Sequence, residues 1–141
     1  MQSCINEKHL DKLVTIANPL DINPGADDEV HAHMAELMLN DEGIDAVVIG
    51  LDPHSPVTHT LAETDVEAFR MDAPGGILER LSAVRERFRK PLVAVVDGGA
   101  QFEPFRNALR ERNIPVFPVC DRAIATLSLY MEARLMVKGL V

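Results

Sequence analysis

Apolar residues in this chain fall into two patterns, short solid runs and stripes at helical spacing. The solid runs lie at Ala46–Leu51, Leu92–Val96 and Val116–Val119. A strand with one face in water alternates apolar and polar residues, so solid runs indicate strands that are buried on both faces. The pattern therefore predicts parallel strands with helices packed on both sides of the sheet.

Between these runs, apolar residues recur every three or four positions, as they do along one face of a helix. The first stripe follows Asp27-Asp28-Glu29, whose negative charge suits the first turn of a helix. The expected inward-facing residues are Val30, Met34, Leu37 and Met38; Ile77, Leu81, Val84 and Phe88; Phe102, Phe105 and Leu109; and Ile124, Leu127, Met131 and Leu135 in a last helix capped by Asp121.

The start of the chain predicts a short helix over Ile5–Leu13 and a strand at Val14–Ala17, which Pro19 keeps short or places at an edge. Pro118 likewise places the last strand at an edge. The alternation of helices and strands over residues 1–141 predicts one domain. We expect a three-layer α/β/α, flavodoxin-like (Rossmann-like) fold with a mostly parallel sheet of about four strands.

Parallel sheets bind ligands at the carboxyl ends of their strands. Three segments that are polar or rich in glycine fall at such ends or next to them: Asn18–Asp21, Asp52–Pro56 and Asp97–Ala100. We therefore expect the candidate site at this rim of the sheet.

The segment after the second expected strand predicts a short helix that begins at Ser55 and reaches about Glu63, because serine is a favoured N-cap and proline is tolerated at the first helical position. The free amides of Val57 and Thr58, with the Ser55 and Thr58 hydroxyls, would then face the strand-end crevice as an anion site. Ordinary helix capping explains the same pattern equally well.

Gly98 and Gly99 end the third expected strand. Because they carry no side chain, a ligand or another domain can approach their backbone closely. A plain turn accounts for the two glycines as well, so their spacing leaves phosphate binding open.

The histidines and acidic residues give weak metal signals. His31 and His33 are two residues apart on a predicted helix, so they face different directions, and we expect a solvated surface there. His54 and His59 with Asp52 lack the spacing of a known zinc motif. The segment from Asp21 starts like a calcium loop, but alanine stands where that loop needs glycine and glutamate: Ala26 and Ala32.

Composition narrows the function classes. The net charge of −8, the 4% aromatic content and the absence of Trp disfavour nucleic-acid binding. The same charge disfavours an anionic membrane surface, and no apolar run approaches the roughly 20 residues that span a bilayer. Cys4 and Cys120 have no CxxC partner, and no signal-peptide pattern is seen, so we expect reduced thiols and a cytoplasmic protein.

Catalytic fingerprints are missing from the sequence. It contains no GxxxxGK[ST], GxGxxG or GxSxG motif. Cys120, at a strand end beside a helix start, is a weak candidate nucleophile, since no histidine is fixed near it by sequence. We expect no catalytic residue and no metal ligand in this chain.

The order and spacing of several segments resemble one domain of the NDP-forming acyl-CoA synthetases, the superfamily that includes succinyl-CoA synthetase. The resemblance runs from about Leu10 to Arg134. The segments are Asn18–Ile22, Ala26–Val30, Asp45–Leu51 with Pro53, Lys90–Gly99, Ile114–Phe117 and Asp121–Ala123.

This resemblance implies a flavodoxin-like CoA-ligase domain. The family's reversible reaction converts acyl-CoA, ADP and phosphate into acid, ATP and CoA through a phosphohistidine, so the whole enzyme is implied to use ADP or ATP, Mg and CoA. In succinyl-CoA synthetases two helix N-termini cradle the phosphohistidine, and the matching helix here is the one expected at Ser55. His59-Thr60 is similar to the family's His-Thr pair, but Leu61 replaces the glycine.

The chain lacks the family's CoA-binding, phosphohistidine and ATP-grasp domains. We therefore expect a piece of a longer protein that is inactive alone, binds no cofactor by itself and contacts those other domains or subunits. The sheet side left open by missing segments favours a homo-oligomer. The alternative is a free-standing, non-catalytic binding or interaction module of the same fold, and the parent reading frame distinguishes the two.

Overall fold

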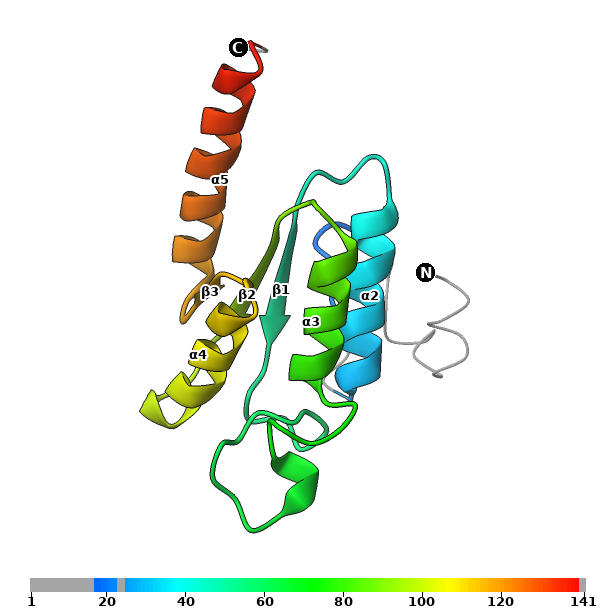
Figure 1. Cartoon of the computed structure of the whole chain (residues 1–141), viewed down its shortest axis with the longest axis vertical. Coiled ribbons are helices and arrows are strands. Elements are labelled where there is room, and N and C mark those ends of the chain that lie inside the picture. Colours follow the sequence, from blue (N-terminus) through cyan, green and yellow to red (C-terminus); the bar gives the residue numbers. More distant parts are fainter. Residues whose placement is uncertain (1–16, 23–24, 140–141) are drawn as a thin grey trace.

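The computed structural model describes residues 17–22 and 25–139 (Figure 1). The helix predicted over Ile5–Leu13 and residues 14–16 of the first predicted strand lie outside the described residues. The described elements are α2 (Asp28–Asn40), β1 (Val47–Leu51), η1 (Glu67–Phe69), α3 (Ile77–Arg87), β2 (Leu92–Val96), η2 (Ala100–Phe102), α4 (Glu103–Glu111), β3 (Val116–Phe117) and α5 (Cys120–Val137).

The described strands form one sheet in the order β1-β2-β3, and every pair is parallel. Val47 pairs with Leu92, and Ala94 pairs with Val116. The structure thus confirms an α/β fold with a parallel sheet, and it contains three described strands where about four were expected. β3 is short and lies at an edge of this sheet, as Pro118 predicted.

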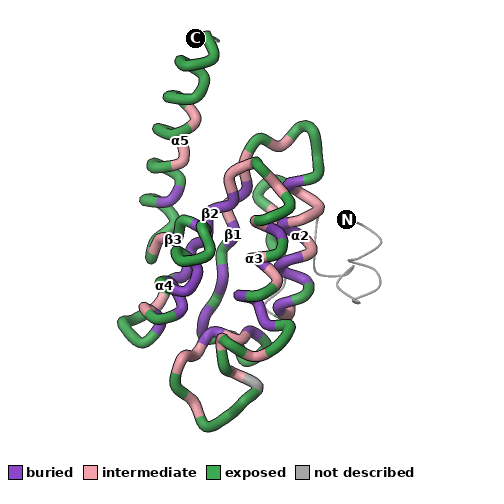
Figure 2. The backbone as a smooth tube through the Cα atoms, viewed as in Figure 1, coloured by how far each residue is buried: buried purple, intermediate pink, exposed green. Residues whose placement is uncertain are grey.

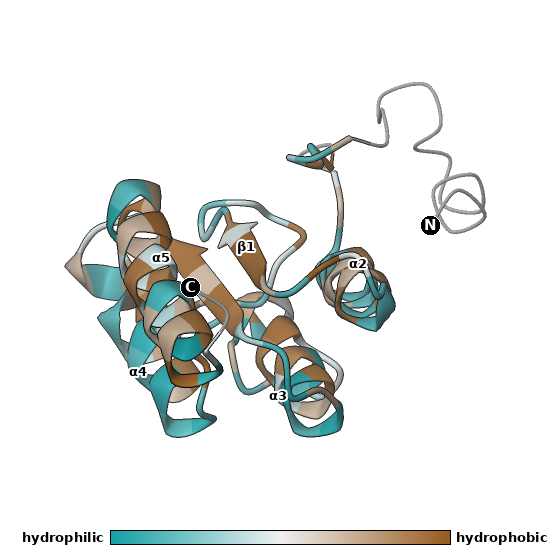
Figure 3. Cartoon of the chain, turned by 90° about the horizontal axis from the view of Figure 1, so that it is seen from above, coloured by the Kyte–Doolittle hydropathy of each residue, from teal (hydrophilic) through white to brown (hydrophobic). Residues whose placement is uncertain are grey.

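The main core lies on one face of the sheet. Side chains from β1 and β2 that share this face pack with α2, α3 and α4: Val47, Ile49, Leu51, Leu92, Ala94 and Val96. Figure 2 shows the buried colour concentrated on the strands and on the adjoining helices, and Figure 3 shows the hydrophobic side of α3 turned toward the strands. Every residue of β2 is buried, which confirms the prediction drawn from its solid apolar run.

The predicted stripes on three helices are confirmed in large part. Val30 and Met34 of α2 are buried in a small cluster with Ala26, against which Leu20 and Ile22 pack. In α3 and α4 the buried positions include Ile77, Leu81, Val84, Phe105 and Leu109. Asp27 caps α2, because its carboxylate accepts a hydrogen bond of 2.9 Å from the Val30 amide.

The expectation for the last helix is confirmed only in part. Leu127 packs against a separate cluster that contains Val93, Val95 and Ala123, whereas Ile124 and Leu135 are 51% and 40% exposed. Val119 stands at the N-cap, not Asp121, and no side chain caps the helix. α5 extends beyond the sheet and is exposed along most of its length (Figures 1 and 2).

Two physical reasons account for this exposure. The 18 residues of α5 span about 27 Å, whereas strands of five residues span about 17 Å. Apolar residues also lie all round the helix, so periodicity does not identify one inner face. Within the described part of the chain, none of the helices combines the length and the apolar character needed to cross a membrane.

Candidate functional site

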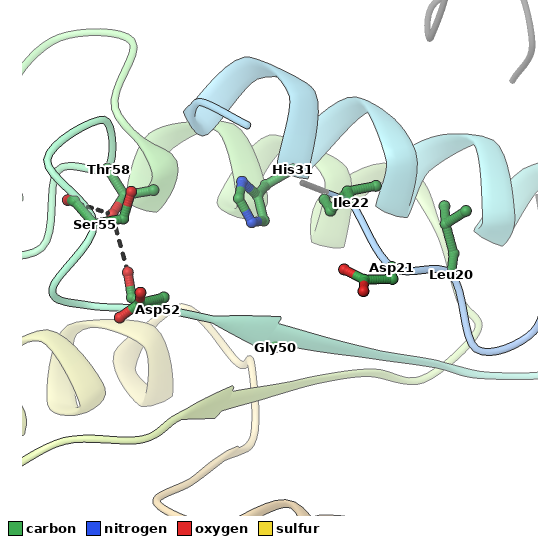
Figure 4. A pocket seen from close by; sticks show the side chains of 8 residues that line it. All are labelled: Leu20, Asp21, Ile22, His31, Gly50, Asp52, Ser55 and Thr58. Atoms are coloured by element: carbon green, nitrogen blue, oxygen red, sulfur yellow. Dashed lines mark hydrogen bonds between the residues drawn. The ribbon is translucent and has the colours of Figure 1, made fainter. Parts of the chain in front are cut away.

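A cavity of about 240 Å³ lies at the carboxyl end of β1 (Figure 4). Three parts of the chain form it: the segment before α2, the first turns of α2, and the end of β1 with the loop that follows. Its lining residues are Leu20, Asp21, Ile22, His31, Gly50, Asp52, Ser55 and Thr58. The prediction that Asn18–Asp21 and Asp52–Pro56 meet at one rim of the sheet is therefore confirmed by the residues that these segments contribute.

The helix predicted to begin at Ser55 is absent. The segment instead makes two tight turns, in which the Ser55 amide donates to the Asp52 carbonyl and the Thr58 amide donates to the Ser55 carbonyl, both at 3.3 Å. The Val57 amide donates to the Ser55 hydroxyl oxygen at 3.4 Å. These amides are used within the loop, so the helix N-terminus expected to bind phosphate does not exist here.

His31 is buried, which corrects the prediction of a solvated surface for it. The residue is 9% exposed, and its Nδ1 lies 2.9 Å from the Asp27 carbonyl oxygen. A carbonyl only accepts hydrogen bonds, so Nδ1 carries the proton, and Nε2 of the neutral ring is an acceptor. His33 is half-buried. The missed signal is that His31 precedes Met34 by three residues and therefore shares its side of the helix.

The carboxylates at the cavity differ in their contacts. Asp21 is exposed and makes no hydrogen bond or ion pair within the described part of the chain. Asp52 accepts a 2.9 Å hydrogen bond from the His54 amide, and its side chain is 66% exposed. The Thr58 hydroxyl lies 3.2 Å from the carbonyl oxygens of Asp52 and Ser55, to which it donates. The lining thus offers mainly acceptors, and it includes no Lys or Arg.

His54 and His59 point to separate neighbours. His54 stacks edge-on against Phe102, with ring centroids 4.9 Å apart. His59 lies in no helix, and its Nδ1 and backbone amide both bond the buried carboxylate of Asp28. Among the residues described, no group of three or more His, Cys, Asp or Glu side chains is placed to hold a metal ion. Asn23 of the calcium-like segment lies outside the described residues.

Gly98, in the loop after β2, has no room for a side chain. A Cβ on Gly98 would lie 2.6 Å from a ring carbon of Phe102 and 3.1 Å from Pro53 Cγ. Gly98 therefore serves the close approach of the protein's own side chains. At Gly99 the nearest atom to an added Cβ is the amide oxygen of Gln101, at 2.3 Å, which ends an exposed and flexible side chain. Neither glycine lines the cavity that Ser55 and Thr58 line.

Arg106 of α4 is buried against the carboxyl end of β2. Its buried guanidinium donates to the carbonyls of Val96 at 3.0 Å, Gly98 at 3.4 Å and Gly99 at 3.0 Å, and to Glu103 at 2.7 Å. Arg106 was not among the residues predicted from the sequence. The available signals were its place beside Phe105 in a buried stripe and its spacing of three from Glu103.

Glu103 is held ionised by two arginines. Hydrogen bonds from Arg110 and Arg106 lower its pKa below the ordinary value of 4.5. The carboxylate thus orients Arg106 toward the strand-end carbonyls and stays charged at neutral pH.

Cys120 is the first residue of α5 and is exposed. No contact in the described part of the chain joins it to a histidine, so the structure adds no partner to this candidate nucleophile.

Comparisons with models of known protein families, with curated proteins and with solved structures found no match to this chain. The resemblance to the acyl-CoA synthetases therefore stays a hypothesis that rests on the sequence motifs and on the arrangement of the segments that carry them.

Proposed function

We propose that this chain is a domain of an NDP-forming acyl-CoA synthetase, which works with CoA-binding, phosphohistidine and ATP-grasp domains and is inactive alone. The observation that carries the proposal is the meeting of the Asn18–Asp21 segment with the loop after β1 around one cavity. The resemblance includes Asn18–Ile22 and, in this loop, Pro53. Both adjoin the carboxyl rim of a parallel sheet, where such folds bind ligands.

Contact with other domains is the role that the geometry supports best. Phosphate binding by Ser55, Val57, Thr58, Gly98 and Gly99 stays a prediction, but it has lost the support of a helix dipole. Carboxylates of Asp21 and Asp52 at the cavity also disfavour a free anion there, because like charges repel. The nucleotide, Mg and CoA of the reaction are assigned to the other domains.

The exposed end of α5 supports the same role. Leu129, Met136 and Val137 are 68%, 64% and 88% exposed. Large apolar side chains gathered along one projecting helix are typical of surfaces that another domain or subunit covers. We assign this end of α5 to domain contacts in the whole enzyme or to self-association.

The test is an assay of the complete reading frame that encodes this chain. With an acyl-CoA panel, ADP, phosphate and Mg, we expect phosphate-dependent release of CoA thiol and formation of ATP by the complete protein. The 141-residue chain serves as the control and should show neither. Acyl-CoA turnover by the chain alone, or a reading frame without CoA-binding and ATP-grasp sequences, would contradict the proposal.

The second candidate is a binding module without chemistry. Burial of Arg106 and Phe102 at the end of β2 favours it, because they close one of the two strand-end loops to ligands. Stop codons at both ends of the chain's reading frame would favour this module over the synthetase domain.

A further inference from the structure

We propose that the cavity at the end of β1 binds a cationic group rich in N–H donors, an alkylammonium or a guanidinium. The inference goes beyond the proposed function and does not rest on it, since it uses only the chemistry of the lining residues. Figure 4 shows the His31 ring between the carboxylate of Asp21 on one side and Asp52 with Thr58 on the other.

The first support is the unused nitrogen of His31. Its Nδ1 is occupied by the Asp27 carbonyl at 2.9 Å, and Nε2 has no partner among the described residues. The residue is more than nine-tenths buried and lines the cavity. Every fully buried side-chain nitrogen or oxygen among the described residues has a hydrogen-bond partner, so Nε2 is open to the cavity and can accept a hydrogen bond from an occupant that donates to it.

The second support is charge. Asp21 and Asp52 both line the cavity, and the lining contains no cationic side chain. Asp52 has His54 as a neighbour, with Nδ1 and Oδ1 3.6 Å apart, whereas Asp21 has no ion partner in the described residues. A cation between them gains from both carboxylates, and an anion such as phosphate is repelled by both.

The third support is size. The cavity of about 240 Å³ is far larger than the roughly 10–15 Å³ that holds one water. Leu20 and Ile22 give it apolar lining against which an alkyl stem can lie. A single metal ion fits less well, because no three donors among the described residues are grouped closely enough to ligate one.

Such a group has two sources with the same chemistry. It is carried by small free amines and guanidines, and also by Lys and Arg side chains of another polypeptide. The experiment separates the sources through matched probes: methylguanidinium and n-butylammonium as small molecules, and the capped peptide acetyl-Gly-Arg-Gly-amide as a polypeptide side chain.

The test is an NMR titration of the full ¹⁵N-labelled chain. We expect saturable shifts of the Gly50, Ser55 and Thr58 amides and of His31 Nε2 with the cationic probes, and none with phosphate. Asp21→Asn removes a charged acceptor and should weaken probe binding about tenfold. Asp45→Asn removes an exposed carboxylate just before β1, at the opposite end of the strand, and should leave binding unchanged.

Each outcome of the titration either supports the proposed cation site or overturns it. Tighter binding of the peptide than of methylguanidinium supports a side-chain occupant, and the reverse order supports a small molecule. The proposal is overturned by absence of shifts with all three cations, by phosphate shifting the same amides, or by equal losses in Asp21→Asn and Asp45→Asn. A His31 ring spectrum with the proton on Nε2 in the free chain also overturns it.

Discussion

The loops after β1 and β2 start from the same position in a parallel sheet and end in opposite ways. The β1 loop satisfies its amides in its own tight turns and leaves a cavity beside it. The β2 loop is filled by Phe102 and by the guanidinium of Arg106, which uses three backbone carbonyls. Of these two loops, only the first contributes residues to the lining of that cavity.

The difference shows how far one can use the rule that parallel sheets bind ligands at the carboxyl ends of their strands. The rule identifies the rim of the sheet, but the local hydrogen-bond partners decide which loop stays open. Gly98 and Gly99 were expected to admit a close approach to their backbone, and at Gly98 the side chains of Phe102 and Pro53 occupy that space. A buried arginine in the following helix is therefore a better guide to a closed loop than the glycines are to an open one.

The largest expected effect comes from removing the buried cation. Arg106→Met keeps most of the stem but leaves the Val96, Gly98 and Gly99 carbonyls without their donor. We expect the free energy of unfolding to fall by about 3 kcal/mol, measured by urea denaturation. Arg110→Met, an exposed neighbour that also binds Glu103, should cost under about 0.5 kcal/mol. Equal losses would show that the β2 loop does not depend on Arg106.

Two glycines test the space in the loops directly. Gly98→Ala forces a Cβ against the buried Phe102 ring and should cost about 2 kcal/mol. A Cβ on Gly50, which lines the cavity, meets nothing within 4 Å, so Gly50→Ala should be neutral or stabilise by up to about 0.5 kcal/mol. Thermal or urea unfolding of both variants checks this, and a neutral Gly98→Ala would contradict the closed loop.

A smaller loss of stability is expected from weakening the contact that holds the loop after β1 against α2. Asp28→Asn weakens the buried contact with the His59 ring and amide, so we expect a loss of about 1 kcal/mol in unfolding free energy. Asp65→Asn changes an exposed carboxylate in the same excursion of the chain and should change little. Amide exchange at Thr58 and Thr60 should rise in Asp28→Asn alone; unchanged exchange would separate this contact from the loop.

The smallest effect concerns pH. The pKa of Glu103 is lowered below 4.5 by Arg110 and Arg106, so its contribution to stability is present above that value. This contribution is lost as the pH falls through the lowered folded-state pKa. Urea midpoints measured from pH 7 to pH 3 should therefore decline less steeply in Glu103→Gln than in the natural chain. The exposed Glu111→Gln should keep the natural slope, and matching slopes in all three would refute this origin.

Much of the fold could be predicted because its signals are local and agree with one another. β2 is a solid apolar run, α2 starts at an acidic first turn, and Asn113 adopts a positive φ of 58° after α4, as its tolerance of that conformation allowed. The inner face of α5 was predicted only in part, because the packing of a helix that is apolar all round depends on what lies beside it.

The location of the candidate site at the rim of the sheet was predictable, but the local backbone structure of its loop was not. The helix at Ser55 does not form because Asp52 and Ser55 capture nearby amides, and Val57, Thr58 and Thr60 are branched at Cβ and favour helix weakly. The buried contact of Asp28 with His59 joins residues that are far apart in sequence. No local pattern reports such pairings.

The long connection between β1 and α3 contains a small loop whose two ends are joined by backbone hydrogen bonds. The Leu61 amide donates to the Phe69 carbonyl at 2.9 Å, and the Met71 amide donates to the Leu61 carbonyl at 2.8 Å. These two hydrogen bonds close the base of the loop formed by residues 62–69, and none of these residues lines the cavity. Replacement of this loop by a peptide tag or a reporter loop should therefore leave the loops at the ends of β1 and β2 unchanged.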